Sequence, residues 1–238
     1  DNFVLFPENK IIEKQLRLAY QKFADLSNTW TTNSNKNISF YKENYSLKNC
    51  HLVKNGVDID VFKSKYAKPD DLVQFDGPIV GFGGKITHLF DYELFNYCVE
   101  KNKDKVFIIV GQILDKNVFS HIKFESNVHY LGDKTYSEYP AYVTNFDIGI
   151  IPYVTNHLEH GADSIKVYEY LAAGILVVGT AAAGMTDLSE YLYVASNKED
   201  FSHYLNEGLK NITSEENKIL PDSHTWAHKA EQIVNILA

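Results

Sequence analysis

Residues 147–179 read DIGIIPYVTNHLEHGADSIKVYEYLAAGILVVG, and this stretch decides the fold. Two short apolar runs, Asp147–Ile151 and Ile175–Gly179, flank a segment with a helical repeat of apolar residues, Ser164–Ala173. Unbroken apolar runs fit strands that are covered on both faces, as in a parallel sheet. The stretch therefore predicts a strand, a helix and a second strand in succession.

Four further apolar runs of the same kind flank this unit. They are Ile79–Phe82, Val106–Val110, Val128–Leu131 and Tyr191–Val194. Helix-length segments separate most of them, at about residues 91–101, 115–121 and 137–144, and residues 224–237 have the pattern of an amphipathic closing helix. Alternation of this kind predicts an α/β fold with a doubly wound parallel sheet, which is a Rossmann-like architecture.

The first part of the chain has a different pattern. The segment from about Pro7 to Phe23 predicts a helix with one apolar stripe. That stripe contains Ile12, Leu16, Ala19 and Phe23. Short strands are predicted at 26–32 and 50–54, and residues 60–76 are polar and are expected to be irregular.

Composition excludes some classes of function. The formal net charge is −8, whereas a general nucleic-acid binder needs a basic surface. No apolar run approaches the roughly 20 residues that a membrane helix needs. Cys50 and Cys98 are the only cysteines, and Cys98 is predicted to be a buried free thiol, which favours a reducing compartment. We expect a cytoplasmic protein, with peripheral attachment to a membrane left open.

A glycine turn follows the strand at 79–82. Ligands of open α/β sheets bind at the carboxyl ends of the strands, near the switch in strand order. Residues 81–85 read GFGGK there, so the backbone at Gly83 and Gly84 could approach a phosphate, and Lys85 could add a positive charge. A tight turn without a ligand explains the glycines equally well.

The start of the helix at Ser164 is the second candidate, because the unpaired N–H groups and the dipole of a helix start attract anions. Lys166 lies in the first turn, where a cation is unfavourable unless an anion is bound. Glu169 shares a face with Lys166 and could accept hydrogen bonds from ribose hydroxyls. A simple ion pair between Lys166 and Glu169, worth about 0.3 kcal/mol, is the alternative.

Other groups of residues give weaker evidence for a functional site. Four potential metal ligands crowd the predicted loop at 153–163: His157, Glu159, His160 and Asp163. They show no strict ligand spacing, so a polar surface loop is the favoured interpretation and no metal is expected. Glu159 and Asp163 could form a hydrolase carboxylate pair, but the sequence gives no separation to test this.

Six segments together resemble the retaining GT-B glycosyltransferases of the family-four type, mainly their C-terminal donor-binding domain. In chain order they are Asn55–Phe62, Ile79–Lys85, Val128–Gly132, Phe146–Pro152, Ser164–Gly174 and the position of Trp226. The resemblance covers roughly residues 50–238 and implies the C-terminal half of a GT-B fold. The glutamate that this family often has eight residues before Glu169 is replaced by Gly161.

The resemblance implies a sugar-nucleotide donor site without a bound metal or other cofactor. Lys85 and Lys166 would carry the catalysis, since positive side chains and a helix dipole stabilise the departing nucleoside diphosphate. Glu169 would hold the ribose, and the segment from Leu131 to Tyr136 would border the nucleobase. The implied binding residues are Gly83, Gly84, Gly132, Tyr136, Ser164 and Glu169.

The sequence therefore predicts two parts: residues 1–55 as a remnant of the acceptor domain, and 56–238 as the nucleotide-sugar-binding domain. Nucleotide binding with little or no sugar transfer is expected of such a fragment. The expected partners are a nucleotide sugar and a carbohydrate or lipid-linked acceptor, and self-association is left open. A non-catalytic binding module and a sugar-nucleotide epimerase of the same fold remain alternatives.

Overall fold

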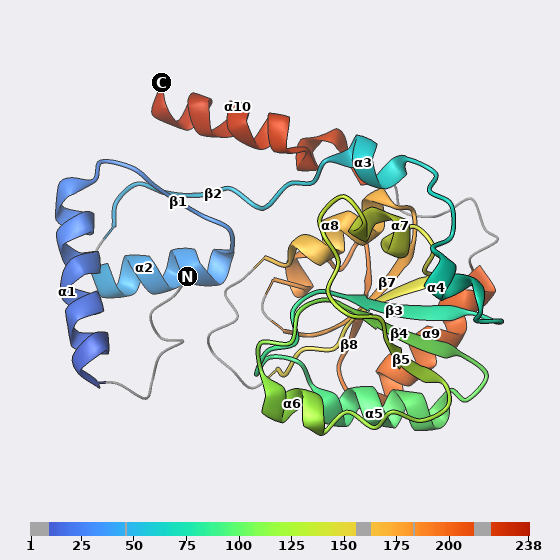
Figure 1. Ribbon diagram of the computed structural model, residues 1–238. Coiled ribbons are helices and arrows are strands. Elements are labelled where there is room, and N and C mark those ends of the chain that lie inside the picture. The colour runs from blue at the N-terminus through green and yellow to red at the C-terminus, as the bar shows by residue number, and fades with distance from the viewer. Residues whose placement is uncertain (1–9, 46, 156–162, 183, 212–219) are drawn as a thin grey trace.

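The computed structural model describes residues 10–45, 47–155, 163–182, 184–211 and 220–238 (Figure 1). Its helices are α1 (Lys10–Leu26), α2 (Asn35–Tyr45), α3 (Ile59–Lys63), α4 (Asp70–Val73), α5 (Tyr92–Lys101), α6 (Lys116–Ser120), α7 (Tyr139–Val143), α8 (Ile165–Ala172), α9 (Lys198–Asn211) and α10 (Trp226–Leu237). Its strands are β1 (Trp30–Thr32), β2 (Cys50–Leu52), β3 (Ile79–Gly83), β4 (Val106–Val110), β5 (Val128–Tyr130), β6 (Ile148–Ile151), β7 (Leu176–Thr180) and β8 (Tyr193–Ala195).

Six strands form one parallel sheet in the order β5-β4-β3-β6-β7-β8. This order is that of a doubly wound sheet, in which the chain turns from one half to the other between β3 and β6. All six strands match the predicted apolar runs to within two residues at each end. The predicted fold class is therefore confirmed.

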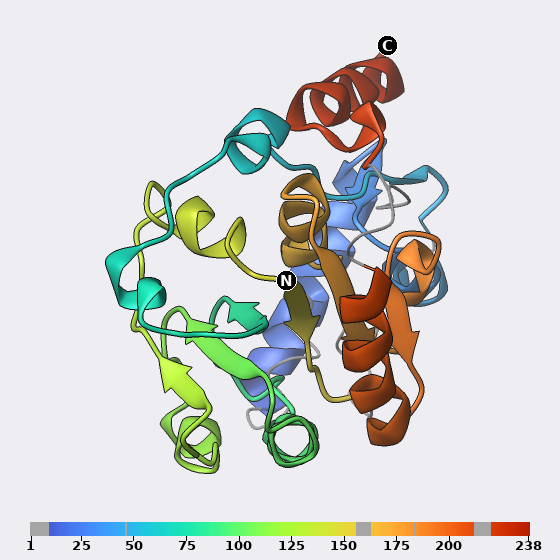
Figure 2. The ribbon, with the colours of Figure 1, turned by 90° about the vertical axis from the view of Figure 1, so that its right-hand side faces the viewer.

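Helices cover both faces of the sheet, as Figure 2 shows in a view turned by 90°. Alternate residues of a strand point to opposite faces, so Ile108 packs with α3, α7 and α8, whereas Phe107 and Ile109 pack with α5, α6 and α9. Burial on both faces explains why the central strands β3, β4 and β6 are apolar throughout. Cys98 lies in the layer between the sheet and α5, α6 and α9, as a free thiol with 1% exposure, as predicted.

The described residues up to Leu52, which are 10–45 and 47–52, form a separate two-stranded unit, seen at the left of Figure 1. In it β1 pairs in parallel with β2, and Tyr20 of α1 packs against Trp30 and Tyr41. The predicted apolar stripe is wrong at its end: Phe23 is 63% exposed, and Tyr20 and Ala24 contact the small core instead.

The segment at 60–76 is not irregular, contrary to the prediction. It contains α3 and α4, which bury Phe62 and Leu72 in the part of the core that lies on the α7 and α8 side of the sheet. The Asp58 carboxylate accepts a hydrogen bond from the Val61 N–H and caps α3. Each helix is too short to display a helical repeat of apolar residues, which explains why the sequence pattern missed both.

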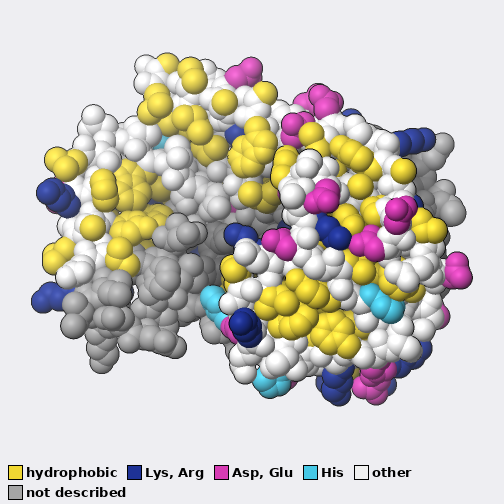
Figure 3. Space-filling view, viewed as in Figure 1, with side chains coloured by type: hydrophobic (Ala, Val, Ile, Leu, Met, Phe, Trp, Pro, Cys, Tyr) yellow, Lys and Arg dark blue, Asp and Glu magenta, His cyan; other side chains and the backbone are white. Residues whose placement is uncertain are grey.

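The closing helix α10 runs back toward the first unit. Gln232 Nε2 donates to the Leu52 carbonyl at 2.9 Å, and the Val57 N–H donates to the His224 carbonyl at 2.9 Å. Hydrophobic side chains gather on the visible surface of α10, along the upper edge of Figure 3. On α10, the side chains of Trp226, Val234 and Leu237 are 47–69% exposed. None of the described helices has the length and apolar character needed to cross a membrane.

Candidate functional site

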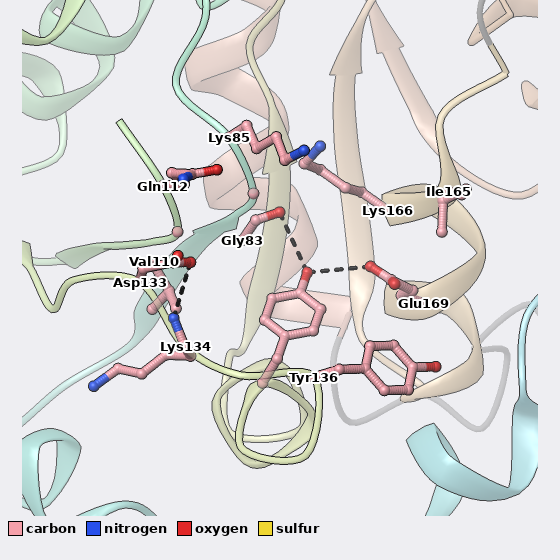
Figure 4. A pocket seen from close by; sticks show the side chains of 13 residues that line it. Gly83, Lys85, Val110, Gln112, Asp133, Lys134, Tyr136, Ile165, Lys166 and Glu169 are labelled. Atoms are coloured by element: carbon pink, nitrogen blue, oxygen red, sulfur yellow. Dashed lines mark hydrogen bonds between the residues drawn. The ribbon is translucent and has the colours of Figure 1, made fainter. Parts of the chain in front are cut away.

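A cleft of about 400 Å³ opens at the carboxyl ends of β3 and β4, beside the start of α8. The described residues that line it are Gly83, Gly84, Lys85, Val110, Gly111, Gln112, Asp133, Lys134, Tyr136, Tyr139, Ile165, Lys166 and Glu169. Ten of them are labelled in Figure 4. The cleft lies next to the switch between β3 and β6, where open α/β sheets bind ligands.

Six of the eight predicted site residues come together there: Gly83, Gly84, Lys85, Tyr136, Lys166 and Glu169. The other two do not line the cleft. Gly132 follows β5 by two residues and has a φ of 83°, and its carbonyl accepts a hydrogen bond from the Gly111 N–H at 2.9 Å, so it supports the neighbouring turn. Ser164 precedes α8, but its side chain makes no capping hydrogen bond to the helix.

The glycine turn and the helix start are in direct contact. The Lys166 side chain crosses Gly84 so closely that a Cβ on Gly84 would lie 1.9 Å from Lys166 Cε. The φ of Gly84 is 150°, a value that L side chains rarely adopt. Glycine at this position is therefore required both by the backbone and by the space that Lys166 occupies.

Two ammonium groups converge at this point. Figure 4 shows the amino ends of Lys85 and Lys166 pointing toward one another across the mouth of the cleft. Lys166 Nζ donates to the Tyr153 hydroxyl at 3.0 Å, and neither lysine forms an ion pair with a carboxylate of the described residues. Like charges repel unless an anion lies between them. The arrangement is therefore suited to a phosphate or diphosphate.

Glu169 lies deeper in the same cleft. Burial raises the pKa of its carboxyl group above the ordinary value, while the Tyr139 hydroxyl and the Lys166 charge oppose the rise. Tyr139 Oη lies 3.2 Å from Glu169 Oε2. A partly buried carboxylate with one oxygen engaged by a protein hydroxyl can accept further hydrogen bonds from ligand hydroxyls.

Lys134 is the third lysine of the cleft, and it has partners in the protein. Its Nζ lies 3.0 Å from Asp71 Oδ2 and 4.6 Å from the centre of the Tyr142 ring. The hydroxyl of Tyr142 donates to the same carboxylate at 2.9 Å. This cluster holds in place the side of the cleft that is formed by the segment after β5. Of the lysines among the described lining residues, Lys85 and Lys166 are those without an ion pair to a carboxylate.

The sequence missed several lining residues. Gly111 and Gln112 follow β4 directly, so the rule that ligands bind at the carboxyl ends of strands could have found them. Gly111 has a φ of 139°, and a Cβ there would lie 2.1 Å from the Gly84 carbonyl oxygen. Tyr139 gave no signal, because its partners are distant in the chain.

The alternatives of metal and carboxylate-pair sites concern residues that are mostly not described. His157, Glu159, His160 and Gly161 lie outside the described residues. Asp163 is described, and its carboxylate accepts hydrogen bonds from the Asn55 N–H at 2.6 Å and the Tyr168 hydroxyl at 2.7 Å. No group of three or more His, Cys, Asp or Glu side chains within the described ranges is placed to hold a metal ion.

Comparison with known families agrees with this geometry. The model of the family "Glycosyl transferases group 1" matches residues 81–211, which include the glycine turn, the cleft and α8. The chain belongs to the group 1 glycosyl transferases. A curated relative, TuaH of Bacillus subtilis (strain 168), is named as a teichuronic acid biosynthesis glycosyltransferase. It is 30% identical over 148 residues, which are 60% of this chain and 37% of TuaH.

Solved structures of low sequence identity share the fold. Anabaena Alr3699/HepE in complex with UDP-glucose has a TM-score of 0.75 at 16% identity, over 94% of this chain and 67% of that chain. A variant of S. aureus TarM in complex with Fondaparinux, alpha-GlcNAc-glycerol and UDP has a TM-score of 0.68 at 16% identity, over 91% and 45%. The chain thus spans between about a third and two thirds of the length of these proteins.

Proposed function

We propose that this chain holds the donor site of a glycosyltransferase, which moves a sugar from a nucleoside diphosphate to a carbohydrate or lipid-linked acceptor. The observation that carries the proposal is the crossing of Lys166 over Gly84, which joins the glycine turn to the start of α8. Membership of the group 1 glycosyl transferases supports the class of reaction.

In this proposal the diphosphate lies between Lys85 and Lys166, within reach of the first N–H groups of α8. Two positive charges and a helix dipole favour the charge that develops on the departing nucleoside diphosphate, and this lowers the barrier to transfer. Lys85 and Lys166 are therefore the proposed catalytic residues. The chemistry requires no bound metal ion in this scheme.

Glu169 is proposed to accept hydrogen bonds from the ribose diol, and the segment that contains Asp133 and Tyr136 is proposed to border the base. Tyr136 is 63% exposed at the rim of the cleft, where a base can stack on its ring. HepE has been solved with UDP-glucose, which supports UDP as the first nucleotide and a hexose as the first sugar to test.

Retention of the anomeric configuration is also part of the proposal, and it rests on the resemblance to family-four enzymes. If the protein that contains this chain transfers sugar, the proton NMR spectrum of the fresh product will show the anomeric configuration of the donor. An inverted product would contradict this part and leave the donor site intact.

A calorimetric titration with UDP, GDP and ADP tests the donor site. Charge-assisted hydrogen bonds contribute about 1.5–3 kcal/mol, so Lys166→Ala and Glu169→Ala should each weaken binding by about 10- to 150-fold. Lys198→Ala is the matched control, since Lys198 is exposed on α9 and does not line the cleft. Absence of nucleotide binding by the unaltered chain would refute the proposal.

Three expectations remain predictions. The assignment of residues 1–55 to the acceptor domain implies that this chain binds nucleotide while it transfers sugar poorly, which a transfer assay with labelled donor would measure. Self-association is measured by sedimentation of the chain over a range of concentrations. A cytoplasmic location, and attachment to the membrane surface, are tested by cell fractionation.

A further inference from the structure

The sheet opens between its two central strands just before the cleft. β3 pairs with β6 only at Val80 and Gly81, so Gly83 has no partner on β6. Its N–H donates to the Tyr170 hydroxyl at 2.7 Å instead. Gly149 makes room for this tyrosine, since a Cβ there would lie 2.3 Å from the Tyr170 ring.

A second tyrosine enters the same opening from α7. Tyr139 Oη lies 3.2 Å from the Gly83 carbonyl oxygen and 3.2 Å from Glu169 Oε2, so its single proton is shared between two acceptors. The ring lies against Gly83, where a Cβ would be 2.5 Å from it. Tyr139 therefore connects the glycine turn with the carboxylate of α8.

We propose that Tyr139 is a positioning residue, which holds the Glu169 carboxylate in one orientation so that its free oxygen receives the ribose diol. The proposal rests on the proposed function of the cleft. A glutamate side chain has several rotamers, and a fixed donor on Oε2 restricts them before the ligand arrives, which reduces the entropy lost on binding. Because Tyr139 also contacts Gly83, it fixes the position of the Glu169 carboxylate relative to the glycine turn that faces the diphosphate.

The hydroxyl also favours the charged carboxylate. Glu169 faces Lys166 and Tyr170 on its own helix, Tyr139 on α7 and Tyr136 on the loop before α7. Burial raises the pKa of Glu169, and the Tyr139 hydrogen bond lowers it. Tyr139 remains protonated at neutral pH, because burial raises the pKa of its own hydroxyl well above the ordinary value.

The test compares UDP with 2′,3′-dideoxy-UDP, which lacks the diol. Tyr139→Phe should reduce the preference for UDP by about three- to ten-fold, the effect of one hydrogen bond. The affinity of this variant for UDP should also fall at a higher pH on acidification than that of the unaltered chain, because Glu169 then takes up its proton more readily. Tyr142→Phe is the control for this preference: it removes a hydroxyl of the same helix whose partner is Asp71, and any shift of the wall of the cleft would affect both nucleotides alike.

A double-mutant cycle separates positioning from a general effect on the fold. In a Glu169→Gln background, Tyr139→Phe should cause little further loss of diol preference. Tyr139→Met fills similar space without a hydroxyl and has the same expected effect, should the Phe variant not fold. An unchanged diol preference and an unchanged pH midpoint in Tyr139→Phe would overturn the inference. If the unaltered chain bound no UDP, the proposed function itself would fail.

Discussion

Replacement of Gly84 by alanine tests whether the contact between the glycine turn and α8 matters for binding. The new Cβ would lie 1.9 Å from Lys166 Cε and 2.6 Å from Lys166 Nζ, so the two side chains cannot keep their present places. The obstructing atoms belong to the far end of a flexible side chain. We therefore expect Lys166 to swing aside while the backbone of the fold is retained.

Two magnitudes follow from this geometry. A residue with a Cβ at a φ of 150° costs about 1–3 kcal/mol of stability, and each kcal/mol lowers the melting temperature of a domain of this size by about 2–4 °C. Loss of the Lys166 contact with a diphosphate costs about 1.5–3 kcal/mol of binding free energy, which weakens the affinity for UDP by about 10- to 150-fold.

Gly174→Ala is the matched control. Gly174 also has a positive φ, 73°, but nothing lies within 4 Å of its missing Cβ. It should therefore lose stability without loss of UDP affinity, as measured by thermal unfolding and calorimetry on both variants. In a Lys166→Ala background, Gly84→Ala should add little further loss of affinity. A Gly84→Ala chain that is folded and binds UDP within about twofold of the unaltered chain would refute the reasoning.

Three further predictions concern stability. Gly111→Ala should lower the free energy of unfolding by about 3 kcal/mol or more, measured by urea denaturation, because its Cβ would lie 2.1 Å from a backbone carbonyl that cannot move aside; a loss below about 1 kcal/mol would contradict this. Burial raises the pKa of Glu169, so the folded chain binds the proton of this carboxyl group more tightly than the unfolded chain does. The free energy of unfolding therefore falls as the pH rises from the pKa of Glu169 in the unfolded chain through its pKa in the folded chain. Glu169→Gln should therefore flatten this part of the pH profile and leave the chain at least as stable at pH 7; a steeper profile would count against it. His224 has the opposite sign: burial lowers its pKa from 6.5 to about 4, so stability is full above 6.5 and is lost on acidification toward 4, and His224→Gln should reduce that loss in unfolding curves taken across this range.

The strands of the sheet could be predicted from the sequence because their burial is so uniform. Val106–Val110 and Ile148–Ile151 are covered on both faces, and this makes them apolar at nearly every position. α3 and α4 depend instead on tertiary contacts of one or two residues, such as Phe62 and Leu72, which no periodicity reveals. Local propensity is a weak guide for helices of this length.

The residues of the site also fall into those that the sequence predicted and those that it did not. Lys85 and Lys166 were predictable because a glycine turn and a helix start are local patterns with a known affinity for anions. Glu169 was predictable because its spacing from Lys166 places both side chains on one face of the helix. Tyr139 was not, because its two hydrogen-bond partners lie 56 and 30 residues away in the chain. Its role depends on the opening between β3 and β6, which only the folded sheet creates.

A crystal structure of the chain with UDP is the most direct test of the account. The diphosphate should lie within hydrogen-bond distance of both Lys85 Nζ and Lys166 Nζ, with the ribose hydroxyls on the Glu169 carboxylate. Clear density for the nucleotide elsewhere on the chain, with the Gly84 turn and Lys166 untouched, would contradict it.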